Sequence, residues 1–142
     1  MSEPVTPIPH PFSDTHRKDN ELPAATVRGG WRFHHLGIPT RAPHPGEKYL
    51  AEFGLYVSGF ESSPFGIEWM RFEDGSPIHE LIRTVPHLAF VVENLERAVE
   101  GMEILTPINS PSVGLRVAMI VSDGAPVELM EFQSPPAPPS DE

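Results

Sequence analysis

Two short sequence words each occur twice in this chain, in the same order, and this repeat constrains the fold more than any other feature. HLGI, which begins at His35, is echoed by HLAF, which begins at His87. GIEWMRF around Glu68 is echoed by PVELMEF around Glu128. Fixed-order self-similarity of this kind indicates a repeated supersecondary unit. Each half of the chain is therefore predicted to begin with a strand that carries a histidine and to end with a strand that carries a glutamate.

Strand patterns dominate the centre of the chain. Alternating runs rich in β-branched and aromatic residues are separated by clusters of Gly, Ser, Pro and Asp. They predict strands over residues 32–39, 51–60, 65–72, 86–92, 113–121 and 126–132. The clearest helical pattern covers residues 95–102, with Asn94 placed to cap it, and weaker ones cover residues 45–50 and 79–83. Each half is thus predicted to be a βαβββ-like unit.

Proline divides the chain into three parts. Of the 18 prolines, eight lie in residues 1–46 and four in residues 135–139. We expect an irregular N-terminal arm over residues 1–30, an ordered domain over residues 31–133 and a flexible tail over residues 134–142.

Charge balance and the lack of cysteine exclude several function classes. Ten basic and 20 acidic residues give a net charge of −10, which disfavours binding to nucleic acid or to an anionic membrane. The absence of cysteine excludes disulfides, thiolate metal sites and cysteine nucleophiles. No apolar run is long enough to span a bilayer, and no secretory signal pattern is visible. We therefore expect a soluble cytoplasmic protein whose partner is a small-molecule substrate.

Strand alternation predicts one face that combines imidazoles, carboxylates and apolar side chains. Its expected members are His35, Glu68, Met70, Phe72, His87, Glu128 and Met130. An apolar lining with a few polar groups is the composition of a ligand pocket. The opposite face is continuously apolar and should pack on the helix around Ala98.

Two histidines and two glutamates on one face favour a divalent metal ion. His35, Glu68, His87 and Glu128 together suit a borderline cation such as Zn²⁺, Ni²⁺, Fe²⁺, Mn²⁺ or Co²⁺. By alternation His34 falls on the other face, and it has no echo in the second half. Tyr56 and Arg116 are further candidates that could orient an anionic substrate.

These motifs resemble the vicinal oxygen chelate superfamily, which includes glyoxalase I, bleomycin-resistance proteins, methylmalonyl-CoA epimerase and extradiol dioxygenases. The resemblance rests on HLGI at His35, on HLAFVVENLERA at His87 and on GAPVELMEF around Glu128. It implies an α+β fold in which two βαβββ modules, about residues 31–77 and 84–133, form a curved, cup-shaped mixed sheet with few short helices.

The same resemblance implies a function. It places His35, Glu68, His87 and Glu128 at the metal-ligand positions, and it suggests a homodimer. A set of four protein ligands resembles the metal sites of the lyase and isomerase members of the superfamily. In those members the metal ion polarises a substrate oxygen and a carboxylate moves a proton. Glu128 is the base expected here.

The sequence is also compatible with three alternative functions. The first is a non-catalytic small-molecule-binding protein of the bleomycin-resistance kind. The second is a ring-cleaving dioxygenase, a class whose members use two histidines and one glutamate. The third is a structural protein whose Pro-rich arm docks onto a neighbour.

Overall fold

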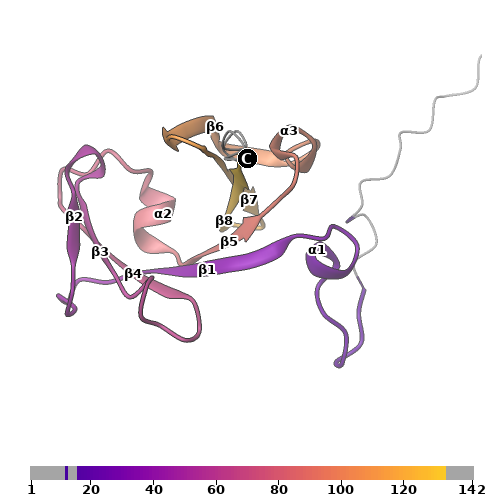
Figure 1. Ribbon diagram of the computed structural model, residues 1–142, viewed down its shortest axis with the longest axis horizontal. Helices are drawn as coiled ribbons and strands as arrows, with labels where there is room; N and C mark the ends of the chain where they lie inside the picture. Colours follow the sequence, from indigo (N-terminus) through magenta and orange to yellow (C-terminus); the bar gives the residue numbers. More distant parts are fainter. Residues whose placement is uncertain (1–11, 13–15, 134–142) are drawn as a thin grey trace, which may run out of the picture.

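A computed structural model describes residue 12 and residues 16–133, and the predicted tail and residues 1–11 and 13–15 of the predicted arm lie outside these residues. Eight strands form one mixed sheet in the order β2-β3-β4-β1-β5-β8-β7-β6, which curls into a half-barrel (Figure 1). The strands are β1 (Arg32–Pro39), β2 (Lys48–Leu50), β3 (Leu55–Ser58), β4 (Ile67–Phe72), β5 (His87–Val91), β6 (Glu103–Ser112), β7 (Leu115–Ser122) and β8 (Ala125–Phe132). The short helices are α1 (Ala24–Val27), η1 (Ala51–Phe53), α2 (Glu80–Thr84) and α3 (Leu95–Ala98). The predicted α+β class and curved mixed sheet are confirmed.

The strand pairing shows how the two halves of the chain are related. In each half the first strand pairs in parallel with the last, so that Gly37 of β1 lies opposite Glu68 of β4 and Ala89 of β5 lies opposite Glu128 of β8. The halves are joined by antiparallel pairing of β1 with β5, where Gly37 lies opposite His87. Because the two first strands are central neighbours, the residues of both repeated words are brought to the middle of the sheet.

The halves differ in the segment that follows their first strand. In the second half, α3 follows β5, and Asn94 caps it by accepting a hydrogen bond from the backbone N–H of Arg97 at 3.0 Å. In the first half, residues 40–47 form bends and turns, and β2 begins at Lys48. The predicted helix over residues 45–50 is therefore wrong.

Two other segments test the sequence pattern, and only the first agrees with it. The pattern over residues 79–83 is confirmed as α2, whose N-terminus is capped by Nδ1 of His79, which accepts from the backbone N–H of Leu81. Residues 103–112 form the edge strand β6, which the sequence pattern does not predict. Its Pro107 and Pro111 are typical of turns, but an edge strand tolerates them because one side of its backbone needs no partner.

The main hydrophobic core lies between α3 and the outer face of the second half. It is built from Val92, Leu95, Ala98, Ala118, Ile120 and Leu129. Leu95 and Leu129 are fully buried, and burying a leucine contributes about 1.5–3 kcal/mol. The prediction that an apolar face packs around Ala98 is confirmed, and this packing leaves the other face of the sheet free to form a cavity. No helix in the described part of the chain is long and apolar enough to cross a membrane.

Candidate metal centre

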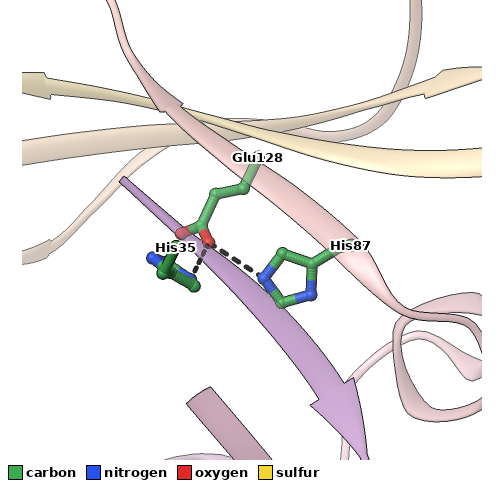
Figure 2. A group of neighbouring side chains, drawn as sticks. All are labelled: His35, His87 and Glu128. Carbon is green, nitrogen blue, oxygen red and sulfur yellow. Dashed lines mark ion pairs between the residues drawn. The ribbon is translucent and has the colours of Figure 1, made fainter. Parts of the chain in front are cut away.

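Three side chains from three strands converge on the cavity face of the sheet (Figure 2). His35 comes from β1, His87 from β5 and Glu128 from β8, and one ligand atom from each lies within 4.8 Å of the others. Oε1 of Glu128 is 3.4 Å from Nε2 of His35 and 3.2 Å from Nε2 of His87. Both histidines are buried. The structure thus brings together three of the four residues that the repeat singles out.

Glu68, the fourth residue, lies beside this cluster. Its Oε1 is 3.7 Å from Nε2 of His35, and it is outside the set of ligand atoms that lie within 4.8 Å of one another. Burial raises the pKa of Glu68, and the negative charge of Glu128 adds to this effect, although the neighbouring His35 opposes it. Glu68 is therefore a carboxylate in the cavity wall whose pKa lies above its usual value.

Glu128 is held as an anion by its two imidazole neighbours. Burial alone would raise its pKa, but hydrogen bonds with His35 and His87 outweigh burial and lower the pKa to about 2. Burial likewise opposes protonation of His35, yet its hydrogen bond to Glu128 and the charges of Glu128 and Glu68 raise the pKa of this imidazole. A buried anion needs a compensating cation, and a divalent metal ion would supply one.

The donor set fits such an ion. Two imidazole nitrogens and a carboxylate oxygen, already gathered within 4.8 Å, are ligands that Zn²⁺, Fe²⁺, Ni²⁺, Mn²⁺ and Co²⁺ accept. His35, His87 and Glu128 are the residues that would hold the ion, with Glu68 near enough to approach it. This arrangement is consistent with the divalent cofactor that the sequence predicts.

A β-bulge gives His34 a place that strict alternation does not predict. The register of β1 against β5 shifts between Phe33 and His35, and His34 lines the same cavity as His35. The prediction that His34 falls on the opposite face is wrong, because a bulge inserts one residue and re-aims the side chains around it. Nothing in the alternation pattern signals such an insertion.

His34 contacts the first of the metal-ligand candidates directly. The Nδ1 atoms of His34 and His35 are 2.8 Å apart, so the Nδ1–H of one ring donates a hydrogen bond to the unprotonated Nδ1 of the other. When Nε2 of His35 offers its lone pair to a metal ion, its Nδ1–H is the donor and Nδ1 of His34 accepts. Burial lowers the pKa of His34, and the charge of a protonated His35 lowers it further, although Glu128 opposes both effects; the neutral, accepting form of His34 is thereby favoured. His34 thus orients the His35 imidazole.

Gly37 makes room for the other histidine. A Cβ at this position would lie 2.2 Å from Cε1 of His87 and less than 3 Å from both of its ring nitrogens. The ring of His87 therefore lies across the backbone of β1, where only glycine allows it. Nδ1 of His87 is buried and makes no hydrogen bond to any of the described residues.

A cavity of about 450 Å³ adjoins the cluster. Its lining includes His34, His35, Glu68, His87 and Glu128, and most of the remaining lining is apolar. Met70 and Met130, predicted to bind substrate, lie in this lining. Thr106 and Asn109 of β6 are its uncharged polar side chains within the described part of the chain.

Three residues predicted to bind substrate do not line this cavity: Tyr56, Phe72 and Arg116. In β3 the cavity positions belong to Leu55 and Val57, so Tyr56 between them points away. The guanidinium of Arg71 lies 4.1 Å from the centre of the Tyr56 ring.

Arg116 is occupied by two carboxylates. Its Nε donates to Glu131 at 3.1 Å, and its terminal nitrogen donates to Glu96 at 2.6 Å. Leu115 and Val117, its neighbours in β7, take the cavity positions. The structure therefore gives Arg116 a role in joining β7 to β8 and α3, and its contact with a substrate stays a prediction.

Comparison with known proteins relates the chain to others through its fold. No protein-family model and no curated protein sequence matches it. A hypothetical protein from Bacillus halodurans C-125 is similar, with a TM-score of 0.56, 18% identity and coverage of 76% of this chain and 99% of that one. Methylmalonyl-CoA epimerase from Mycobacterium tuberculosis is similar with a TM-score of 0.50, 18% identity and coverage of 73% and 89%. At this identity the likeness concerns the fold and not the activity.

Proposed function

We propose that this chain is a metal-dependent lyase or isomerase of the vicinal oxygen chelate superfamily, glyoxalase- or epimerase-like, that acts on a small oxygenated metabolite. The observation that carries the proposal is the convergence of His35, His87 and Glu128 on one point beside a cavity. Fold similarity to methylmalonyl-CoA epimerase supports the fold on which the proposal builds.

A divalent ion bound here would supply Lewis acidity to a carbonyl or enediolate oxygen of the substrate. Glu68 is better placed than Glu128 to move a proton on the neighbouring carbon. Its Oε1 is 3.7 Å from His35, beyond hydrogen-bond distance, whereas Glu128 faces two imidazoles at 3.4 and 3.2 Å. The looser carboxylate can take a C–H proton and return it, while Glu128 stays a ligand.

Metal titration of the purified protein, after treatment with a chelator, tests the proposed site. We expect about one divalent ion per chain, and we expect His87→Ala and Glu128→Ala to lose it because each removes a ligand from a small set. His16→Ala is the matched control, since His16 is an exposed histidine. Full metal content in both ligand variants would refute the assignment.

Proton exchange in D₂O tests the role of Glu68. The metal-loaded protein is incubated in D₂O with a panel of 2-oxo and 2-hydroxy compounds. NMR then detects whether deuterium is incorporated at the carbon next to the oxygenated carbon. Loss of a general base costs about 10²- to 10⁴-fold, so Glu68→Gln should slow this exchange by that factor while metal binding remains. Exchange at the wild-type rate in the metal-loaded Glu68→Gln variant would refute Glu68 as the base and favour Glu128 in that role.

One observation favours a second candidate, a ring-cleaving dioxygenase. The compact ligand set consists of two imidazoles and one carboxylate, which is the set used by non-haem Fe(II) oxygenases. Oxygen uptake by the Fe²⁺-loaded protein with catechol as the probe would support this candidate. Uptake no faster than that of the His87→Ala variant would eliminate it.

A further inference from the structure

We propose that the cavity beside the metal centre selects uncharged, largely apolar ligands about the size of one or two aromatic rings and excludes phosphorylated ones. The oxygenated end of such a ligand would face His35, His87 and Glu128, and only this detail rests on the proposed function. Selection by the apolar walls does not require the metal ion.

The first argument is the size and chemistry of the walls. A cavity of about 450 Å³ falls within the range of roughly 300–1,000 Å³ that is typical of small-molecule sites. Strands from both halves contribute apolar side chains to it, among them Leu55, Val57, Met70, Val117, Met119 and Met130. Apolar walls on opposite sides stabilise a ligand by removing its apolar surface from water.

The second argument is an aromatic surface next to the cluster. Phe60 lines the cavity, and its ring stacks on His34 at a centroid distance of 5.2 Å and lies edge-to-face with His35 at 5.9 Å. A flat ligand whose polar end reaches the histidines would therefore contact the Phe60 ring. Aromatic pairs of this kind stabilise a complex beyond the effect of area burial.

The third argument is charge. Within the described residues the cavity lining contains no arginine or lysine, whereas it contains the carboxylates of Glu68 and Glu128. Two arginines on strands that line the cavity, Arg71 of β4 and Arg116 of β7, are engaged elsewhere, with Glu47 and Glu131. A phosphate group in this cavity would meet the carboxylates of Glu68 and Glu128 and no arginine or lysine, and the charge of the His35 imidazole is already paired with Glu128, so the desolvation of the phosphate would be poorly offset.

The polar wall residues do not change this conclusion. The amide nitrogen of Asn109 already donates to the carbonyl oxygen of Pro107 at 3.0 Å.

With a divalent ion bound, the charges of the ion, Glu68 and Glu128 sum to zero, which suits a ligand without charge beyond its metal-binding end.

Methyl-group NMR of the chelator-treated full-length protein tests the proposal. Methionine labelled with ¹³C at its methyl group reports on the cavity through Met70, Met119 and Met130, whereas Met102 packs against the core cluster around Leu95 and serves as an internal control. Individual Met→Leu variants assign the signals. The probes are 2-naphthol and 2-naphthyl phosphate, which share a ring system and differ in charge.

We expect 2-naphthol to shift the three cavity methyl signals, to leave Met102 unchanged and to bind at least about 10-fold more tightly than the phosphate. Phe60→Ser should weaken 2-naphthol binding by about 5- to 10-fold, in line with the loss of an aromatic contact. Phe65→Ser is the matched control, because Phe65 is 75% exposed and lies outside the cavity lining.

Equal affinity for the two probes, or the absence of any shift in the three cavity signals, would overturn the proposal. No metal ion is present in this experiment. A failed metal titration would therefore refute the proposed function and leave ligand selection by the cavity intact, while the NMR result could fail with the metal site confirmed.

Discussion

Substituting Gly37 with alanine should damage the metal centre although residue 37 is not a ligand. The new methyl group would lie 2.2 Å from Cε1 of His87, and ordinary contact begins at 3.4 Å, so the ring must retreat by more than about 1 Å. His87 is only 2% exposed, so its ring can retreat only within the protein, into its packed neighbours or into the adjoining cavity. Metal-ligand distances tolerate shifts of about 0.2 Å, so a displacement of this size removes His87 from the ligand set.

Two magnitudes follow from this overlap. Forcing an extra carbon into a packed site costs about 1–3 kcal/mol of stability. Metal affinity should fall by more than the roughly 10- to 100-fold that is lost when an outer partner of a ligand is removed, because here a ligand itself is displaced. Urea denaturation measures the first quantity, and competition with a chromophoric chelator measures the second.

A double-mutant cycle isolates the clash as the cause. In the His87→Ala background the added methyl group meets no ring, so Gly37→Ala should cost less than about 0.5 kcal/mol there. Gly75→Ala is the control, because a Cβ at Gly75 meets nothing within 4 Å. Wild-type metal affinity in Gly37→Ala, or the same destabilisation with and without the His87 ring, would refute the reasoning.

Three further predictions concern residues around the site and the core. His34→Phe keeps a ring but removes the nitrogen that faces His35, so metal affinity measured by calorimetry should fall about 10- to 100-fold; an unchanged affinity would show that His34 does not orient the ligand. Glu131→Gln weakens acceptance from Arg116 and from the backbone N–H of α3, so the free energy of unfolding in urea should fall by about 1–3 kcal/mol while metal affinity stays at the wild-type value. Asn94→Ala removes the N-cap of α3 and should cost about 1 kcal/mol in thermal denaturation, and a change below about 0.3 kcal/mol would contradict that role.

The repeat predicts the paired architecture and a set of four residues, three of which, His35, His87 and Glu128, form the cluster. Strand alternation has a period of two, so the positions of His35, His87 and Glu128 within their words determine which face they share. Because the two repeated words occur in the same order, they predict equivalent strand positions in the two halves. The central β1–β5 pairing then brings the first strands of the two halves together. Local pattern and global fold agree here, and such agreement is what makes a site predictable.

Other features depend on neighbours that no local pattern specifies. The bulge in β1 turns His34 into the cavity, and the arrangement of residues 40–47 replaces the helix expected in the first half. Strand β6 accepts two prolines because it lies at the sheet edge, and a strand's place in the sheet is decided by tertiary pairing.

The sequence by itself therefore determined that two halves alike in pattern would present histidines and glutamates on one face. Only the tertiary structure decided that Glu68 lies beside the cluster and that Arg116 is held in ion pairs. It also decided that the cavity walls are mostly apolar and, within the described residues, include no arginine or lysine. The physical reason is that periodicity sets the direction of a side chain along one strand, whereas its distance to a partner depends on how the whole sheet curls.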